Sequence, residues 1–477
     1  MTSARARRTA AGLAAVAAVL AVGVVAPAHA ADQPVPGGWY IDQGGVPEAH
    51  AAGFRGQGVT IAVIDSQINP DVPALRGADL RVTEPAFCRG AGGAEIPAVS
   101  TDGQVADHGT QVVSTILGTG AAGEGQWPVR GVAPEATVLY YAGMTGRTAD
   151  ADAASLECLD DQGTNIRLDG AGHAFEAALD AGADIVSISL SGPISGVLQD
   201  AIARAHAEGV VVLAAMPNDT GAVTFPAGRN GVVTVQALDE AGQIMAGDKG
   251  IEGAPLTPNT SESVVVAAPG IGILVPDAGE GWTAQALVDG TSLATPIVAG
   301  SLAVLKSRFP EASGNQLIQT MLGTTGGSRH EPAWRDDVGY GPISLTGMLA
   351  DDPLSYPDVN PLFDNPQFEL AMAYGPTADE VAAAGAEAPA TAPETASTTA
   401  PAETAAPAPW GMWAVAGGAL VVVGGAFALV LGLGASRRRR AAAATTPPTP
   451  TAATAADENS HGVPGGYAGA GHDGGKR

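Results

Sequence analysis

Residues 183–215 read ADIVSISLSGPISGVLQDAIARAHAEGVVVLAA. Two short apolar runs in this stretch, 183–190 and 209–215, are rich in Val and Ile, as buried strands are. Between them, residues 198–209 have the apolar spacing of a helix and end at Gly209, a typical C-cap. A strand, a helix and a second strand in this order predict two parallel strands of one sheet.

Four further apolar runs repeat the strand pattern, and another helical stretch lies among them. The runs are VTIAVID (59–65), ATVLYYA (136–142), GVVTVQAL (231–238) and SVVVAAPG (263–270). HAFEAALDAG (173–182) has helical spacing. Strands that alternate with helices predict an α/β fold with a mostly parallel sheet between two layers of helices. The functional site of such a fold lies at the carboxyl ends of the strands.

Composition bounds the class of protein before any motif is considered. The chain has 477 residues, 45% of them hydrophobic and 15% charged, so it can bury a full core. It holds 23 Lys and Arg against 49 Asp and Glu, a net charge of −26. This balance argues against a nucleic-acid partner, which would require a clustered basic face. Two cysteines are too few for a disulfide scaffold.

Both ends of the chain carry segments that predict targeting to a membrane. Residues 1–30 contain three arginines, an uncharged apolar run and Ala28-His29-Ala30, the pattern of a cleaved signal peptide. An uncleaved anchor is the alternative, but the run is short and rich in Ala rather than Leu. Residues 410–434 have no charge and are long enough for a transmembrane helix. Four arginines follow at 437–440, so the positive-inside rule predicts a single-pass cell-membrane protein with an extracellular domain and a cytoplasmic tail.

One globular unit and a spacer lie between these ends. Residues 31–350 contain all the predicted strands and have the size of one large domain. Residues 351–409 drift into repeated Ala, Pro, Thr and Glu, which predicts a semi-extended linker. The tail, 435–477, is expected to be disordered. Residues 31–409 hold 14 Lys and Arg and 46 Asp and Glu, so the exported part carries a net charge of −32.

Three polar residues fall where the fold predicts a site. Asp65 ends the first strand, in AVIDSQINPD. His108 lies in DHGTQVVSTILG, which predicts a helix over residues 107–118. Ser292 lies in DGTSLATPIVAG, at the start of a helix predicted to run to Leu305. Taken singly, each has an ordinary structural explanation, as a turn residue, a polar group at a helix start or an N-cap.

Taken together, the three residues supply what a serine nucleophile needs. An imidazole takes the hydroxyl proton, and a carboxylate fixes the tautomer of that imidazole and stabilises its charged form. The order Asp, His, Ser along the chain is that of subtilisin. On these motifs the chain resembles the subtilisin-like serine proteases over nearly all of residues 50–350. The resemblance implies their three-layer fold and hydrolysis of peptide bonds through an acyl-enzyme, with Asp65, His108 and Ser292 as the triad.

The resemblance also assigns roles to two further segments. AAMPND (214–219) looks like the segment that supplies the oxyanion-hole asparagine, here Asn218, which would act with the N–H of Ser292. ISLSG (188–192) looks like the substrate-binding strand. The substrate-binding residues that it implies are Ser189, Leu190, Ser191 and Gly192. Because Met216 adds volume to the facing wall, we expect a shallow pocket for small or medium apolar side chains.

Four other histidines of the globular unit compete with His108 for the role of general base. They are His50, His173, His206 and His330. None is followed by Gly-Thr, as the family base is, and two lie in predicted helices where surface or core roles are commoner. We therefore assign the base to His108.

The motifs depart from the family pattern at several positions around these groups. Gln67 stands where Gly is common and reaches positive φ less easily, and Val113-Ser114 replaces Ala-Gly in the His helix. Pro217 replaces the Gly before the oxyanion Asn, and Leu293 and Ile297 replace bulkier or polar residues after the Ser. None of these changes deletes a catalytic group. They keep open a second function, a catalytically weak scaffold that stabilises a membrane secretion complex.

The layout of the chain resembles one branch of the family, the membrane-anchored mycosins of type VII secretion. Only residues 31–58 precede the first strand, too few for a folded pro-domain, and we expect this segment to pack against the domain. The resemblance implies a polypeptide substrate, attachment to the cell membrane through residues 410–434 and components of a secretion complex as partners. A membrane-anchored subtilisin outside such a complex is one alternative. A plain surface adhesin is another, but it leaves the three motifs unexplained.

The two cysteines and the Asp-rich stretches are the remaining candidates for a disulfide and a metal site. Cys88 and Cys158 enter an oxidising compartment, so a disulfide worth about 4 kcal/mol is the natural prediction, although one of them can instead be free. No Cys/His cluster predicts zinc, and we expect no cofactor. Asp-rich stretches at 150–152 and 160–161 are interpreted as solvated loops, with structural calcium as the alternative.

Overall fold

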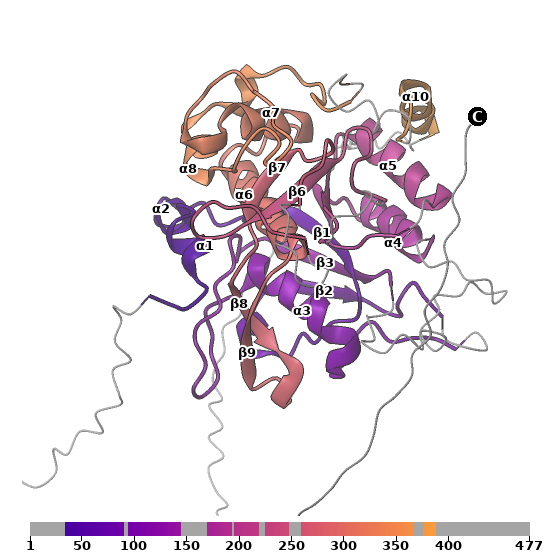
Figure 1. Cartoon of the computed structure of the whole chain (residues 1–477). Coiled ribbons are helices and arrows are strands. Elements are labelled where there is room, and N and C mark those ends of the chain that lie inside the picture. The colour runs from indigo at the N-terminus through magenta and orange to yellow at the C-terminus, as the bar shows by residue number, and fades with distance from the viewer. Residues whose placement is uncertain are drawn as a thin grey trace, which may run out of the picture. The chain divides into compact units, whose positions relative to one another are not determined.

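A seven-stranded sheet forms the centre of the described structure, and all its neighbouring strands pair in parallel (Figure 1). The computed structural model describes residues 34–89, 94–144, 169–192, 195–218, 225–247, 259–363, 365 and 375–387. The strand order is β2-β3-β1-β4-β5-β6-β7. The strands are β1 (Thr60–Asp65), β2 (Leu80–Thr83), β3 (Thr137–Ala142), β4 (Ile185–Ile188), β5 (Val211–Ala215), β6 (Val233–Leu238) and β7 (Val266–Pro269). A separate antiparallel hairpin consists of β8 (Ile273–Asp277) and β9 (Ala284–Val288).

The six predicted strands are confirmed. Three further strands were not predicted, of which β8 is buried over most of its length and β2 and β9 are less buried. β1 and β3 to β7 correspond to the Val- and Ile-rich runs. β2 is one of the two edge strands, pairs only with β3 and is partly exposed, and its sequence LRVT lacks the apolar run of the buried strands. β9 is likewise half-buried along most of its length.

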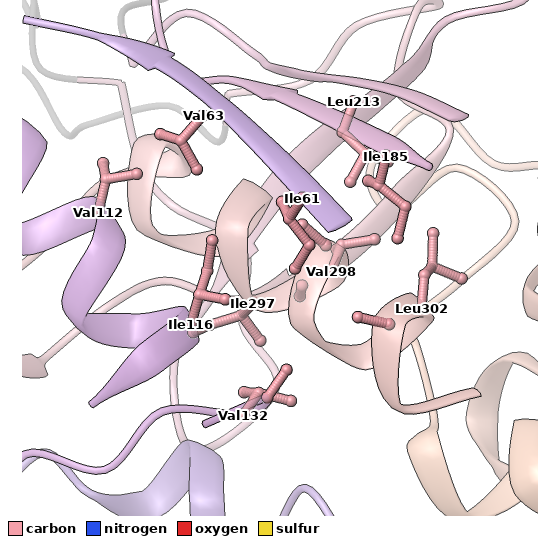
Figure 2. Close-up of a cluster of buried hydrophobic side chains, with 14 of the residues drawn as sticks. Ile61, Val63, Val112, Ile116, Val132, Ile185, Leu213, Ile297, Val298 and Leu302 are labelled. Atoms are coloured by element: carbon pink, nitrogen blue, oxygen red, sulfur yellow. The ribbon is translucent and has the colours of Figure 1, made fainter. Parts of the chain in front are cut away.

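Helices cover both faces of the sheet, as the sequence predicts. α3 (Gly103–Leu117) and α6 (Thr291–Arg308) pack on one face, and α4 (Asp169–Asp180) and α5 (Gly196–Glu208) pack on the other. Alternate residues of β1 serve the two layers, because successive side chains of a strand point to opposite faces. Ile61 and Val63 lie against α3 and α6, as Figure 2 shows, whereas Ala62 and Ile64 belong to the α4–α5 core.

Helix α3 begins earlier than the sequence predicted. We expected it to open at Asp107, but it starts at Gly103, because the carboxylate of Asp102 caps it by accepting the N–H of Gln104 at 3.0 Å. His108 therefore lies in the second turn of the helix instead of the first. Its imidazole lies beside Asp65 at the end of β1.

The segment before the first strand packs against the domain, as expected. It contains α1 (Trp39–Asp42) and α2 (Val46–Ala51), and Tyr40 and Ile41 are 2% and 3% exposed within the main core. The hydroxyl of Tyr40 donates to the carbonyl oxygen of Arg130 at 2.5 Å. The carbonyl oxygen of Gly37 accepts the N–H of Leu274 at 3.1 Å, so the segment also binds β8.

The packed part of the chain extends past Ala350, the boundary expected from sequence. After α7 (Gly314–Gly323) and α8 (Leu345–Ala350), Leu362 is 2% exposed and Asn360 donates to the carbonyl oxygen of Gly231 at 3.0 Å. Helix α10 (Ala378–Glu387) packs against α5. Apolar and amide side chains within 351–363 attach this stretch to the domain, although its Pro and Asp content resembles a spacer. The short 3₁₀ helices are η1 (Pro73–Leu75), η4 (Ala278–Glu280), η5 (Thr325–Gly327) and η6 (Pro353–Ser355).

The predicted targeting segments lie outside the described residues. This applies to the signal peptide at 1–30, the membrane span at 410–434 and the tail at 435–477. Within the part of the chain that the structure does describe, no helix has the length and apolar character needed to cross a bilayer.

Candidate active site

Asp65 and His108 meet at the carboxyl end of β1. The sheet order places β3 on one side of β1 and β4 on the other, which is the switch point where α/β folds form their sites. Asp65 is 0% exposed, and its Oδ1 lies 2.7 Å from Nδ1 of His108, whose side chain is 33% exposed. The same oxygen accepts the N–H of Ser66 at 2.7 Å. With Nδ1–H bound to the carboxylate, Nε2 of the imidazole is left as the basic nitrogen.

Helix α3 approaches β1 closely because Gly109 has no side chain. A Cβ at this position would lie 1.9 Å from the hydroxyl oxygen of Tyr140 and 2.7 Å from the carbonyl oxygen of Gln67. Tyr140 is 0% exposed and donates to the carbonyl oxygen of Ser66 at 2.7 Å. Burial, and after it the charge of Asp65, raises the pKa of Tyr140 well above its usual value, so the phenol remains a donor. Gly109 and Tyr140 together fix the distance between the carboxylate and the imidazole.

The loop after β1 accommodates Gln67, which replaces the usual glycine. Among the described residues, Trp282 is the only non-glycine residue with positive φ, so Gln67 has ordinary backbone geometry. Its side-chain amide donates to the carbonyl oxygen of Pro97 at 2.6 Å. Thr110 of α3 accepts the N–H of Asn69 at 2.9 Å and ties the same loop to the helix. The conformational difficulty expected at Gln67 does not arise.

Ser292 lies in the first turn of α6, and a proline shapes that turn. Pro296 has no N–H, so the carbonyl of Ser292, four residues earlier, lacks its helical donor. Ser189, just beyond β4, supplies one, because its hydroxyl donates to this carbonyl at 2.8 Å. The N–H of Ser292 has no partner among the backbone bonds of the described residues, as is usual at a helix start. This N–H is available to a ligand oxygen.

Asn218 follows β5, and Thr291 orients its side chain. The Oδ1 atom of Asn218 accepts the N–H of Thr291 at 3.1 Å and lies 2.8 Å from its hydroxyl. That hydroxyl also reaches the carbonyl oxygen of Met216. A Cβ on Gly290 would lie 2.9 Å from Ser292 Oγ and 3.8 Å from Asn218 Nδ2, so both atoms face the same small space. Thr291 was not singled out from sequence, although it stands in the quoted DGTS motif.

The predicted substrate-binding segment follows β4, where the chain becomes more exposed. Ser191 is exposed, and Gly192 exchanges two backbone hydrogen bonds with Phe225, at 3.0 and 3.1 Å. Leu190 is partly buried and packs against the α4–α5 core. Met216 is 2% exposed, and its sulfur lies 3.7 Å from the side-chain amide nitrogen of Gln236. This packing places Met216 inside the domain rather than on the pocket wall where we expected it.

The other departures from the family motifs are absorbed by the core. Val113 and Ser114 are both 0% exposed, and the hydroxyl of Ser114 donates to the carbonyl oxygen of Gln111 at 2.7 Å. Leu293 and Ile297 are 1% and 3% exposed on the inner side of α6. These side chains act in packing and leave the polar atoms of the site unchanged.

Of the histidines in the described ranges, only His108 lies at ion-pair distance from a carboxylate. Burial lowers the pKa of His50, whose Nε2 lies 2.8 Å from the carbonyl oxygen of Val132. Burial also lowers the pKa of His206 to about 4. His173 is exposed on α4, and His330 Nε2 lies 3.0 Å from the hydroxyl of Thr325.

Neither a metal site nor the disulfide pair can be placed on these residues. Within the described part of the chain, no group of three or more His, Cys, Asp or Glu is arranged to hold a metal ion. The Asp-rich stretches at 150–152 and 160–161 lie outside it, as does Cys158. Cys88 is 1% exposed, and no free cysteine occurs among the described residues. The Cys88–Cys158 bridge stays a prediction.

Comparisons with known proteins agree with this geometry. Residues 56–341 match the Subtilase family. The thermostable alkaline protease of Halalkalibacterium halodurans is 30% identical over 293 residues, which cover 60% of this chain and 67% of that protein. Subtilisin Savinase of Lederbergia lenta is 31% identical over 303 residues, which cover 61% of this chain and 94% of that protein. The crystal structure of fervidolysin from Fervidobacterium pennivorans, described as a keratinolytic enzyme related to subtilisin, superposes with a TM-score of 0.51 at 25% identity, over 66% of this chain and 46% of that one. The chain belongs to the subtilase family and is a subtilisin-like serine endopeptidase.

Proposed function

We propose that this protein is a membrane-anchored extracellular endopeptidase that cleaves polypeptides through an acyl-enzyme on Ser292. One observation carries the proposal: the buried carboxylate of Asp65 holds His108 at 2.7 Å, at the same end of the sheet where Asn218 and Ser292 flank Gly290. Asp65 orients the imidazole of His108, and His108 transfers the protons. Ser292 attacks the scissile carbonyl carbon, and Asn218 stabilises the oxyanion that forms.

In acylation, Ser292 Oγ forms a bond to the scissile carbonyl carbon while its proton passes to Nε2 of His108. Asp65 stabilises the resulting imidazolium through Nδ1–H. The carbonyl oxygen becomes an oxyanion that accepts hydrogen bonds from Asn218 Nδ2 and the N–H of Ser292. When the C–N bond breaks, Nε2 donates its proton to the leaving amine.

Deacylation repeats these steps with water as the nucleophile. Water gives one proton to Nε2 of His108 and forms a bond to the acyl carbon. The bond from that carbon to Ser292 Oγ then breaks, and Oγ recovers the proton from Nε2. The carboxylic acid leaves, and the enzyme returns to its starting state with no net gain or loss of protons.

For specificity we propose a shallow pocket before the scissile bond, walled by residues 189–192 and by the segment 215–218 apart from the buried Met216. The exposed Ser191 stands where the family usually has Gly, which supports a preference for small or medium apolar residues. Cleavage rates on a peptide library measure this preference. A clear preference for Arg or Phe would refute it.

We propose that residues 410–434 anchor the protein in the cell membrane with the protease domain outside. The basic residues 437–440, directly after the span, support this orientation. The full chain should partition into the membrane fraction, and deletion of 410–434 should release it. Externally added protease should digest the domain in intact cells, and a full chain found in the soluble fraction would contradict the anchor.

We also propose that Cys88 pairs with Cys158 in the exported protein, because the chain has two cysteines and Cys88 is buried. Thiol alkylation of the denatured protein should add mass only after reduction. Equal masses with and without reductant would contradict the bridge.

Labelling of Ser292 by a fluorophosphonate probe tests the catalytic part of the proposal. The wild-type full chain in detergent should become labelled, and the Ser292→Ala variant should not. The alternative of an inactive scaffold in a secretion complex predicts no Ser292-dependent labelling on a folded protein. Circular dichroism of both variants confirms that they are folded.

A further inference from the structure

A second asparagine, Asn259, binds the main chain of the loop that carries Asn218. Pro217 precedes Asn218 and has no N–H, so the main chain cannot donate a hydrogen bond at residue 217. Its carbonyl oxygen accepts the side-chain amide of Asn259 at 2.6 Å. Asn259 is 1% exposed and stands more than forty residues later in the chain. The contact therefore ties two distant loops together at the oxyanion residue.

Asn259 is itself fixed by the sheet. Its N–H donates to the carbonyl oxygen of Met245 at 3.0 Å, and its own carbonyl oxygen accepts the side-chain amide of Gln236. Gln236 is 0% exposed in β6, and its Oε1 accepts the N–H of Ala237 at 2.7 Å. A buried amide with both ends bonded does not exchange partners with water, so it defines one position for Asn259.

The oxyanion asparagine is therefore held from two sides. Thr291 binds its Oδ1 on the side of α6, and Asn259 binds the preceding peptide on the side of β6. The direction of Asn218 Nδ2 depends on that peptide, because the side chain turns with its own backbone. An oxyanion donor is effective only within a few tenths of an ångström of its place.

We propose that Asn259 is a positioning residue of the oxyanion hole and that Gln236 supports it. The hydrogen bond from Asn259 takes the place of the main-chain hydrogen bond that Pro217 cannot donate. This inference rests on the proposed function of Asn218. Removal of the Asn259 amide takes away the donor to the half-buried carbonyl of Pro217 and frees the Pro217–Asn218 peptide to rotate. Asn259 acts through Asn218 and does not touch the substrate.

The test is a double-mutant cycle on peptide hydrolysis by the full chain in detergent. Asn218→Ala alone should lower kcat by about 10²–10³, the loss known for the equivalent donor of subtilisin. Asn259→Ala alone should lower kcat about tenfold and leave KM within twofold. In the Asn218→Ala background, Asn259→Ala should change kcat by less than twofold, because the group through which it acts is gone.

A matched control separates positioning from stability. Asn230 is 2% exposed and likewise donates its side-chain amide to a proline carbonyl, that of Pro376, at 2.9 Å. Asn230→Ala should lower thermal stability as Asn259→Ala does but keep kcat within twofold of wild type. If Asn259→Ala fails to fold, Gln236→Met removes the support of Asn259 and should lower kcat about threefold.

Three outcomes overturn the proposal. The first is an unchanged kcat in Asn259→Ala and Gln236→Met. The second is an equal loss from Asn259→Ala in the wild-type and Asn218→Ala backgrounds. The third is a crystal structure of Asn259→Ala in which the Pro217–Asn218 peptide and the Asn218 side chain keep their places. The crystal structure tests the inference even when the wild type has no Ser292-dependent activity, a result that would instead reject the proposed function.

Discussion

At the residue scale, Gly290 shows how tightly the atoms of the site are packed. Its φ of 175° is extended backbone that any residue adopts, so its lack of a side chain is a matter of space. A Cβ there would lie 2.9 Å from Ser292 Oγ. Gly290→Ala should therefore lower the rate of fluorophosphonate labelling at least tenfold and shift Tm by only a few degrees.

The control for this substitution is Gly196→Ala at the start of α5, where a Cβ meets nothing within 4 Å. Gly196→Ala should leave both the labelling rate and Tm close to wild type. Equal labelling of Gly290→Ala and wild type would show that Ser292 Oγ moves freely in this space.

The candidate site residues could be named from the sequence, but the contacts that support them could not. Asp65, His108 and Ser292 lie in motifs whose residue types and spacing indicate their chemistry. The role of Asn259 depends on a contact between two loops more than forty residues apart, which no local pattern reports. The same holds for Met216, whose direction is set by packing against Gln236 and not by its place in AAMPND.

At the element scale, the spacing between α3 and the sheet sets the Asp65–His108 distance. Gly109→Ala places a methyl group against the Tyr140 hydroxyl and the Gln67 carbonyl, so α3 must move. We expect a loss of about 1–3 kcal/mol in the free energy of unfolding, as for overpacked cores, together with reduced labelling of Ser292. Urea unfolding followed by circular dichroism measures the first effect.

A second substitution tests the cause assigned to this effect. Tyr140→Phe removes the nearest clashing atom, and the next ring carbon lies 3.1 Å from the added Cβ. The double variant Gly109→Ala, Tyr140→Phe should therefore be more stable than the sum of the single losses predicts. Strict additivity would contradict the steric explanation.

Helix α5 carries a pH-sensitive group that the catalytic site does not use. His206 Nε2 lies 3.0 Å from the carbonyl oxygen of Asn230, and burial lowers the pKa of His206 from 6.5 to about 4. The unfolded chain binds this proton below pH 6.5 and the folded chain only near pH 4, so stability falls as pH drops through that window. The loss amounts to about 3 kcal/mol.

Urea midpoints between pH 7.5 and 4 measure this dependence. A cavity of about 360 Å³ beside His206 is also lined by Asp184, Glu208, Lys306 and Asp358. His206→Gln should remove about 3 kcal/mol of the acid-induced loss. Identical slopes for wild type and His206→Gln would refute the assignment.

Strands of the sheet with long Val- and Ile-rich runs were predictable, whereas the start of α3 and the strands β2, β8 and β9 were not. The strands β1 and β3 to β7 and the helices α4 and α5 follow directly from Val, Ile and Ala patterns. The start of α3 was misplaced because a single capping carboxylate, Asp102, decides it. Strand β2 was missed because its short sequence LRVT is partly exposed and holds no continuous apolar run.

At the scale of the whole molecule, the stretch after Ala350 contributes to the stability of the domain. Leu362 is buried, and Asn360 and Asn230 each donate a side-chain amide between this stretch and the domain. A chain that ends at residue 350 should lose about 3–5 kcal/mol in the free energy of unfolding relative to one that ends at 393. Equal urea midpoints for the two chains would place the true boundary at Ala350.

The central claim is that Asp65, His108, Ser292 and Asn218 form a working protease, and turnover of a peptide substrate tests it most directly. The full chain in detergent is incubated with a peptide library, and mass spectrometry follows the products. We predict cleavage at defined sites with multiple turnovers, and a fall of at least 10³-fold in Ser292→Ala with unchanged thermal stability. A folded wild type that cleaves no peptide, or cleavage that survives Ser292→Ala, would contradict this account.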